Sequence, residues 1–363
     1  MPPMVLLDAT PLRGPGGDRA DAAVVRGLIG GFRRRPEQER PHLLLAPGCA
    51  APPGFVPCRL SPRPWGLGRA TCRTIPWRDV PDAVAADLVH LTSTEPIAAP
   101  RQISTCLDLI PLRFPALAFG AGSGAARRRY NAFLDRLAWA RLVLVPTQAV
   151  ARDVTELLGI PESRVRVVGL GAPPVTEPGT PSGDPPVILV VANREPYTNA
   201  ALAVRALAAV DRRHEAHLVI VGVDDRHRRD RLRRLAAALG VSARTVVSGS
   251  LGEARMADLR RTAAVALVPS YADGVSVPAL AALAAGLPVL ASDIPELAEL
   301  LGPGRAHIPG FTPPAWAAAL EDLLSDGAAR ARLSADGHAR ASALSWRDCA
   351  DATWGCYLEA GDA

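Results

Sequence analysis

Lysine is absent from this chain, and all 41 basic residues among its 363 are arginine. A site that would ordinarily use an ammonium group as a point charge must therefore use a guanidinium or none. A GC-rich coding sequence explains this bias, since the 31 glycines and 35 prolines fit it as well. The absence excludes catalysis by a lysine side chain.

Aromatic residues are also few, at 4% of the chain. Arginine clusters at residues 33–35, 127–129 and 226–234 have no aromatic platform beside them, and the last cluster interleaves acidic residues in a helical pattern. Solvated helix faces explain such clusters better than a nucleic-acid footprint does. We therefore expect no nucleic-acid partner, although the formal net charge is +5.

Long apolar runs and cysteine pairs are missing as well. No run approaches the roughly 18 residues of a spanning helix, and the first residues form neither a basic leader nor a long apolar segment. The six cysteines form no Cys-x-x-Cys pair, and no Asp-x-Asp cluster indicates a metal. We expect a soluble, cytoplasmic chain with reduced thiols and with no metal or other cofactor.

The residues that are present predict an α/β protein. With 48% hydrophobic and 21% charged residues, the chain has the composition of a globular protein, and its 363 residues suffice for two domains. Apolar strand-like runs alternate with helical patterns in both halves, which favours parallel sheets with helices on both faces. The expected strands are 5–7, 41–45, 87–91, 104–107, 142–146, 165–170, 187–191, 217–221, 245–248, 265–268 and 289–292. The expected helices include 18–30, 125–140, 199–210, 228–239, 254–262 and 278–285.

A proline- and glycine-rich segment separates the two halves. Residues 173–186 combine these residues with small polar ones, which is typical of a linker. The expected domains are therefore residues 1–172 and 187–340. Two doubly wound domains leave a cleft at the carboxyl ends of their sheets, and such clefts usually hold a nucleotide or a nucleotide-bearing substrate.

The segment from Val268 to Asp293 resembles the signature of the retaining GT-B glycosyltransferases of family 4, which include many mannosyl- and glucosyltransferases. The resemblance implies the GT-B architecture, in which two Rossmann-like, doubly wound domains face each other across a cleft. It implies a nucleotide-sugar donor held mainly by the second domain, an unknown acceptor held mainly by the first, and a C-terminal helix, 341–363, that returns to the first. Other segments agree in order: 8–12, 108–115, 145–153, 195–199, 248–251 and 345–346.

The turn at residues 273–276, just ahead of Pro278, suits an anion. Backbone N–H groups and the positive end of the following helix can point at one diphosphate. Gly16 and Gly17 offer a second cluster of N–H groups, with a plain turn as the equal alternative. The predicted donor-binding residues are Gly16, Gly17, Asn193, Arg194, Thr198, Gly249, Ser250, Leu251, Ser270, Gly274, Val275, Ser276 and Val277.

Three side chains are candidates for catalysis. The resemblance implies that Asp273 contacts the sugar hydroxyls, and it assigns Asp108 to a motif of the first domain. His90 follows a predicted strand, where an acceptor contact and a structural histidine fit equally well. In this mechanism the diphosphate leaves while an acceptor hydroxyl attacks the same face of the sugar, without a metal and with help from Arg194 or Arg19.

Five positions depart from the family. The first is Asp273, which stands for a glutamate and keeps its charge on a side chain one methylene shorter. The resemblance implies a ribose-binding glutamate where this chain has Ala281, a histidine at Leu107, and an arginine and a lysine at Asn193 and Thr198. The loss of one charge-assisted hydrogen bond costs roughly 1.5 to 3 kcal/mol. These departures lower the expected affinity for an ordinary nucleotide-sugar.

Two interpretations follow. An active retaining glycosyltransferase is favoured because Asp273, Ser270 and the glycine turn are retained. The alternative is a degenerate glycosyltransferase that acts as a binding or activating partner of a second glycosyltransferase. A variant between these two interpretations is an enzyme with an unusual donor. In another form of it, arginines outside the motif bind the diphosphate of the donor.

Aromatic residues at two places have their own interpretation. The helix at 125–140 carries arginines at its start with Phe133, Leu137 and Trp139 behind them, so contact with an anionic membrane surface is an alternative to core-facing packing, which is favoured. The aromatic residues near the C-terminus are expected to pack the returning helix. They are Trp346, Trp354 and Tyr357.

Overall fold

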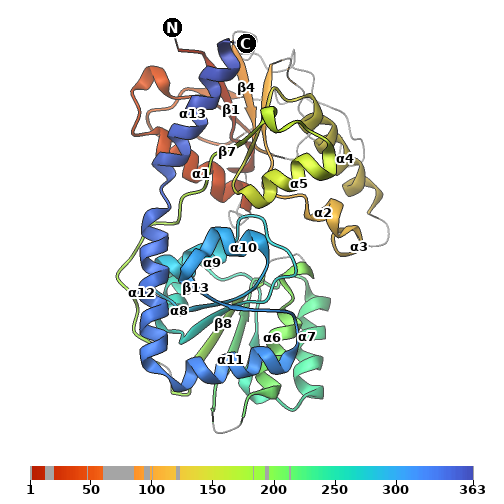
Figure 1. Cartoon of the computed structure of the whole chain (residues 1–363), viewed down its shortest axis with the longest axis vertical. Helices are drawn as coiled ribbons and strands as arrows, with labels where there is room; N and C mark the ends of the chain where they lie inside the picture. The colour runs from red at the N-terminus through yellow and green to blue at the C-terminus, as the bar shows by residue number, and fades with distance from the viewer. Residues whose placement is uncertain are drawn as a thin grey trace. The chain divides into compact units, whose positions relative to one another are not determined.

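The computed structural model describes residues 2–12, 20–46, 48–59, 86–93, 99, 101–119, 123–182, 184–192, 196–211 and 214–362. The chain forms two compact units, one of residues 1–171 with 345–363 and one of residues 172–344. Each unit is a parallel sheet covered by helices (Figure 1). The predicted α/β class with two Rossmann-like domains is therefore confirmed. No described helix has the length and apolar character needed to cross a membrane.

The first unit contains a seven-stranded sheet in the order β3-β2-β1-β4-β5-β6-β7. Its central strands are buried along their whole length because helices cover both faces, which explains their continuous apolar runs. β3 escaped prediction because its three residues hold no apolar run, and β5 lies two residues earlier than predicted because it buries polar side chains. The strands are β1 (Val5–Asp8), β2 (His42–Leu45), β3 (Pro57–Arg59), β4 (Leu88–Leu91), β5 (Gln102–Thr105), β6 (Leu142–Val145) and β7 (Val165–Val167).

Helices of the first unit cover this sheet. In α4 the side chains of Phe133 and Leu137 join the core, as the core-facing interpretation predicts, but Trp139 is 82% exposed and departs from it. The helices are α1 (Ala20–Phe32), α2 (Ile110–Arg113), α3 (Pro115–Ala118), α4 (Gly124–Trp139), α5 (Gln148–Leu158) and α13 (Trp346–Asp362). Short 3-10 segments are η1 (Thr10–Leu12), η2 (Glu37–Glu39) and η5 (Glu162–Arg164).

The C-terminal helix α13 packs against α1. Tyr357 stacks on Phe32 with ring centroids 6.0 Å apart, and Trp354 meets the same ring edge-on at 6.5 Å. The backbone carbonyl of Trp346 approaches Gly31 so closely that a Cβ at this glycine would lie 2.1 Å from its oxygen. The aromatic residues near the C-terminus are thus packing residues, as predicted.

The second unit contains a six-stranded parallel sheet in the order β10-β9-β8-β11-β12-β13. The expected strands of this unit are all present, and β13 is an addition. The strands are β8 (Val187–Val191), β9 (His217–Val221), β10 (Thr245–Val247), β11 (Val265–Val268), β12 (Val289–Ser292) and β13 (Arg305–Ile308).

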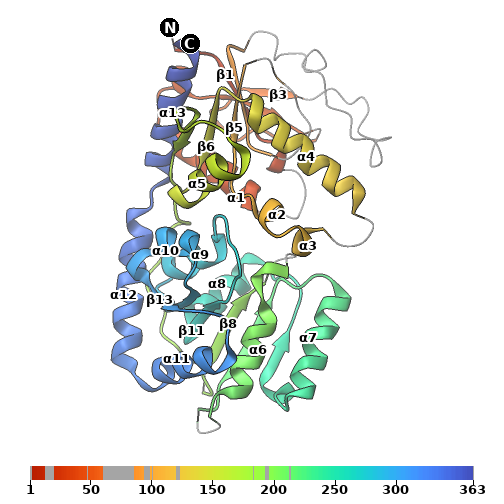
Figure 2. The ribbon, with the colours of Figure 1, turned by 45° about the vertical axis from the view of Figure 1, so that its right-hand side comes forward.

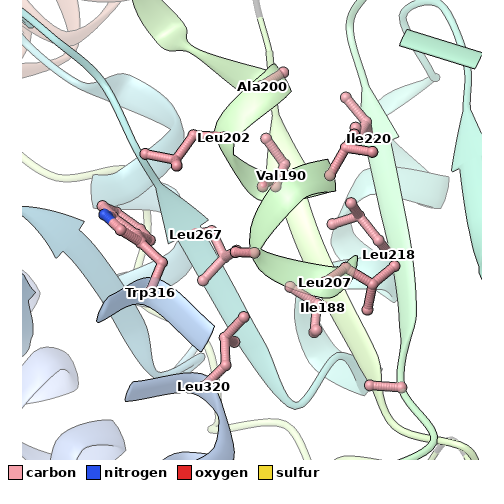
Figure 3. Packing of buried hydrophobic residues seen from close by; sticks show 14 of the residues in the cluster. Ile188, Val190, Ala200, Leu202, Leu207, Leu218, Ile220, Leu267, Trp316 and Leu320 are labelled. Carbon is pink, nitrogen blue, oxygen red and sulfur yellow. The ribbon is translucent and has the colours of Figure 1, made fainter. Parts of the chain in front are cut away.

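Helices α6 and α11 close the core over one part of this sheet. Figure 3 shows apolar side chains of β8, β9 and β11 meeting Leu202 and Leu207 of α6 and Trp316 and Leu320 of α11. The helices are α6 (Ala200–Ala209), α7 (Arg226–Ala238), α8 (Glu253–Thr262), α9 (Val277–Ala284), α10 (Pro295–Leu301), α11 (Pro313–Ser325) and α12 (Gly327–Ala343). Short 3-10 segments are η6 (Pro196–Thr198), η7 (Ser242–Arg244) and η8 (Gly302–Gly304).

The segment predicted to be a linker lies along the second unit. Backbone N–H groups of Thr176, Gly179 and Ser182 donate to carbonyl oxygens of Ala284, Ala285 and Thr262 at 3.1 to 3.2 Å. The second unit continues to residue 344, and the next helix begins at residue 346. The segment is thus held by backbone hydrogen bonds rather than spanning free between domains.

The contact between α1 and α13 predicts a sharp difference between two neighbouring glycines. Gly31→Ala places a methyl group against a backbone carbonyl, which cannot move unless α13 shifts, so we expect a loss of about 1–3 kcal/mol in the free energy of unfolding. Gly30→Ala meets nothing within 4 Å and should gain roughly 0.5–1 kcal/mol from helix propensity. Urea denaturation followed by tryptophan fluorescence measures both. Equal stability of the two variants would contradict the packing described here.

Candidate functional site

The loops after β8 and β11 lie at a topological switch point. β9 and β10 extend the sheet to one side of β8, and β12 and β13 extend it to the other side of β11. Connections from the two central strands therefore leave in opposite directions, and open α/β sheets bind ligands at this place. The backbone N–H of Tyr271, after β11, donates to the carbonyl oxygen of Tyr197, after β8, at 2.8 Å. The two loops are thus tied to each other.

The turn after β11 is organised by Asp273. Its Oδ1 accepts the backbone N–H of Ser276 at 2.9 Å, and its Oδ2 lies 3.5 Å from the hydroxyl of Ser270. Ser270 and Ser276 are 2% and 5% exposed, and Ser276 has a left-handed backbone with φ of 30°. Asp273 itself is half-buried. A carboxylate ahead of a helix is favoured by the positive end of that helix.

This geometry changes the predicted role of Ser276. Its N–H was expected to face a diphosphate, but it donates to the carboxylate of Asp273. Val277, at the start of α9, still has an N–H group free of helical pairing by position, whereas Pro278 has none. Gly274 and Val275 are buried in the same turn. The chemistry offered here is a fixed carboxylate beside a helix start.

The loops after β9 and β10 are joined by Asp224. Its Oδ1 accepts the backbone N–H of Ser250 at 2.8 Å, and its Oδ2 accepts the hydroxyl of Ser250 at 2.9 Å. Gly222, with φ of 86°, donates its N–H to the carbonyl oxygen of Gly249 at 3.2 Å. A Cβ at Gly222 would lie 2.3 Å from the carbonyl oxygen of Ala192, so the position requires glycine. The predicted base-contacting segment, Gly249 to Leu251, is thereby held in place.

Sequence reasoning missed Asp224, although a signal was present. An acidic residue three positions after a buried parallel strand lies at the same carboxyl edge as the other predicted site residues. The backbone N–H and the hydroxyl of Ser250 both donate to the Asp224 carboxylate. Ser250 therefore acts in positioning the segment.

Thr198 contacts an arginine from another helix. Its side chain is 8% exposed, and its Oγ1 accepts a hydrogen bond from Nη2 of Arg228 at 3.2 Å. Arg228 belongs to the first turn of α7, where Asp225 caps the helix by accepting the Arg228 N–H at 2.7 Å. The sequence placed Arg228 among solvated helix residues. Instead it is half-buried and reaches Thr198 in η6, directly ahead of α6.

Several predicted residues fall elsewhere. Gly16, Gly17, Arg19, Asn193 and Arg194 lie outside the described residues. Ala281 lies in α9 with 9% exposure, and its methyl group accepts no hydrogen bond. The described part of the predicted donor site is thus the turn after β11, the clamped segment after β10, and Thr198.

The prediction that His90 contacts an acceptor is wrong. The residue is 1% exposed in β4, and its ring nitrogens lie 2.7 Å from the hydroxyl of Tyr357 and 2.6 Å from that of Thr105. Burial lowers the pKa of His90 to about 3. The structural alternative is confirmed, because the neutral imidazole joins α13 to the sheet.

Asp108 opens a helix in the first unit. Its Oδ1 accepts the backbone N–H of Ile110 at 3.0 Å, at the start of α2, and it is half-buried. The thiol of Cys106 lies 3.4 Å from the Asp108 carbonyl oxygen, and burial together with the Asp108 charge holds the pKa of this thiol well above its usual range. The thiol is therefore a packing group, and a catalytic role of Asp108 stays a prediction.

The buried histidine predicts a stability change with pH. The folded pKa of about 3 lies below the ordinary value of 6.5, so the stabilisation is complete above pH 6.5 and is lost as the pH falls toward 3. The slope from this one group reaches about 1.4 kcal/mol per pH unit. We expect a His90→Asn variant to show a flatter dependence of unfolding free energy on pH between about 6 and 4. Urea denaturation at each pH measures the free energy of unfolding. If this free energy changed equally with pH in the two proteins, His90 would be charged in the fold.

Comparison with known proteins identifies relatives of the second unit in particular. Residues 176–340 match the family described as Glycosyl transferases group 1. The chain is 30% identical over 253 residues to a D-inositol 3-phosphate glycosyltransferase of Acidothermus cellulolyticus, which covers 64% of this chain and 56% of that protein. The same enzyme of Nocardia farcinica is 30% identical over 243 residues, covering 62% and 54%. The chain thus spans about half the length of the curated relatives it matches.

Solved glycosyltransferase structures share the fold. Sucrose-phosphate synthase from Thermosynechococcus elongatus superposes with a TM-score of 0.74 at 18% identity, covering 99% of each chain. Anabaena Alr3699/HepE in complex with UDP and glucose superposes with a TM-score of 0.71 at 16% identity, covering 98% of this chain and 99% of that one. Such identities establish fold alone. The chain therefore has the GT-B fold, and residues 176–340 carry its match to the glycosyl transferases group 1 family.

Proposed function

We propose that the protein is a retaining, family 4 glycosyltransferase that moves a hexose from a nucleotide-sugar to a hydroxyl of a small molecule or glycan. The observation that carries the proposal is the Asp273 carboxylate, fixed by Ser276 in the turn after β11 at the switch point. Relatives named as glycosyltransferases, and a structural neighbour solved with UDP-glucose, support a sugar donor of this class.

In the proposed reaction Asp273 orients the sugar. Its Oδ1 is held by the Ser276 N–H, and its Oδ2 accepts hydrogen bonds from sugar hydroxyls. The acceptor hydroxyl attacks the sugar on the face from which the nucleoside diphosphate departs and gives its proton to the departing phosphate oxygen. The N–H groups of Gly274, Val275 and Val277 stabilise the departing charge. The backbone of Gly249 to Leu251, clamped by Asp224, binds the base. The proposed reaction needs no metal and takes place in the cytoplasm.

A second candidate function is a non-catalytic partner of another glycosyltransferase. The buried methyl group of Ala281 favours it, because a ribose hydroxyl gains no acceptor there. The hydrogen bond from the Ser276 N–H to Asp273 favours it too, because this N–H no longer donates to a phosphate. Nucleotide binding separates the two functions.

Titration calorimetry of the purified protein with UDP, GDP, ADP and dTDP tests the proposed function. We expect at least one to bind with a Kd below about 0.1 mM, which corresponds to more than about 5.5 kcal/mol of binding free energy. The matching nucleosides serve as controls for the base alone. Affinities no better than millimolar for all four diphosphates would favour the non-catalytic partner.

The role of Asp273 is tested by Asp273→Asn, since the amide oxygen can still accept the Ser276 N–H while the charge is lost. We expect sugar transfer to fall about 10- to 100-fold, in keeping with the loss of one charge-assisted hydrogen bond, and nucleotide affinity to stay within about twofold. Asp258→Asn on the exposed face of α8 is the matched control. An equal fall in transfer and in nucleotide affinity would assign Asp273 to the nucleotide instead.

A further inference from the structure

Two aromatic side chains are exposed beside each other in loops that follow strands of the second sheet. Tyr271, after β11, is 40% exposed, and Phe311, after β13, is 36% exposed. Their ring centroids are 4.6 Å apart, and the ring planes are tilted by 55°. Among the described residues, the other exposed aromatic side chain is Trp139 of the first unit. Exposed rings held together in this way offer apolar surface to a ligand.

Hydrogen bonds hold the backbone beside both rings. The Tyr271 N–H donates to the carbonyl oxygen of Tyr197 at 2.8 Å. The carbonyl oxygen of Gly310, next to Phe311, accepts Nε1 of the fully buried Trp316 at 3.2 Å. α11, which begins two positions after Phe311, lies beside α6 (Figure 2). The two rings therefore stand on a backbone that is fixed before a ligand binds, which lowers the entropic cost of binding.

The Tyr271 ring lies on the same side of its segment as the Asp273 carboxylate. Tyr271 is exposed, Ala272 is 1% exposed and Asp273 is half-buried, and this alternation is that of an extended backbone. The segment thus presents a ring and a carboxylate together. A hexose matches both, because its C–H groups form apolar faces and its hydroxyls surround the ring edge.

The strand order separates this aromatic pair from the segment proposed to bind the base. Gly249 to Leu251 follow β10, and β9 and β8 lie between β10 and β11 in the sheet. A donor whose base contacts Gly249 to Leu251 therefore has its sugar, rather than its base, near the loop after β11.

We propose that Tyr271 and Phe311 bind the sugar ring of the nucleotide-sugar donor by stacking on one of its C–H faces. Asp273 accepts hydroxyls at the edge of the same ring, since a carboxylate oxygen accepts more than one hydrogen bond and the bond from Ser276 can remain. This inference rests on the proposed function and adds to it the side chains that recognise the sugar.

Tyr271→Ala is the test, and Leu239→Ala, directly after α7 and also 40% exposed, is the matched control. Calorimetry compares the tightest-binding of UDP, GDP, ADP and dTDP with the glucose and mannose conjugates of the same nucleotide. We expect Tyr271→Ala to weaken the tighter-binding conjugate at least about fivefold and the diphosphate less than about twofold, because the lost contacts are with the sugar. Leu239→Ala should change neither. Unchanged conjugate affinity, or an equal loss for conjugate and diphosphate, would overturn the assignment.

Two further variants show whether the rings themselves are needed. Tyr271→Phe keeps the ring and should bind both ligands as wild-type protein does, whereas Phe311→Ala removes the neighbouring ring and should weaken the conjugate about threefold. A loss in Tyr271→Phe as large as that in Tyr271→Ala would assign the effect to the phenol hydroxyl and contradict stacking.

Saturation-transfer NMR locates the contact independently of affinity. When aromatic protons of the wild-type protein are irradiated, C–H protons of the bound sugar should receive more saturation than those of the ribose, and Tyr271→Ala should remove this difference. Stronger transfer to the ribose or the base would overturn the assignment to the sugar, as would a protein that binds a diphosphate but neither conjugate. If wild-type protein binds none of the four diphosphates, the proposed function fails first, an outcome distinct from conjugate binding that is indifferent to Tyr271.

Discussion

The pairing of β8 with β11 is the constraint on which the candidate site depends. The two strands run parallel in register, with Ile188 beside Val265 and Val190 beside Leu267, and their apolar side chains are buried on both faces. Because the strand order reverses at this pair, the chain leaving β8 and the chain leaving β11 turn to opposite sides. The hydrogen bond between Tyr271 and Tyr197 then fixes the two loops against each other. The turn of Asp273 and the contact of Thr198 both follow from this geometry.

The charges of the site are arranged so that each carboxylate has a backbone partner. Asp273, Asp224 and Asp225 accept N–H groups of Ser276, Ser250 and Arg228. Such hydrogen bonds fix the loops and spread the negative charge onto peptide groups. Nη2 of Arg228 donates to the hydroxyl of Thr198. The second unit therefore holds an oriented carboxylate in the turn after β11 and an anchored guanidinium on α7.

The sequence predicted the framework of the second unit closely. β8, β9, β11 and β12 begin and end at the predicted residues, because short apolar runs bounded by turn residues determine buried parallel strands. The turn of Asp273 was also predicted, since it lies within one continuous motif. The first unit was harder, because β5 buries polar residues and β3 has no apolar run.

Side-chain partners far apart in sequence were beyond prediction. Thr198 and Arg228 are 30 positions apart, and Asp224 and Ser250 are 26 apart, so each contact depends on how neighbouring strands and helices pack. A pattern of arginines on a helix cannot tell which one points to solvent. His90 failed for the same reason, since its partner Tyr357 is 267 positions away on the last helix. Periodicity locates elements, whereas contacts between elements need the fold.

The absence of lysine thereby gains a structural meaning. An ammonium on residue 198 would deliver charge from the loop itself, on a flexible stem. Here a planar guanidinium comes from α7, anchored at its backbone by Asp225 and at its tip by Thr198. Anchoring at both ends restricts the rotamers of the Arg228 side chain. Residue 198 therefore acts through its hydroxyl, which holds an arginine that a neighbouring helix supplies.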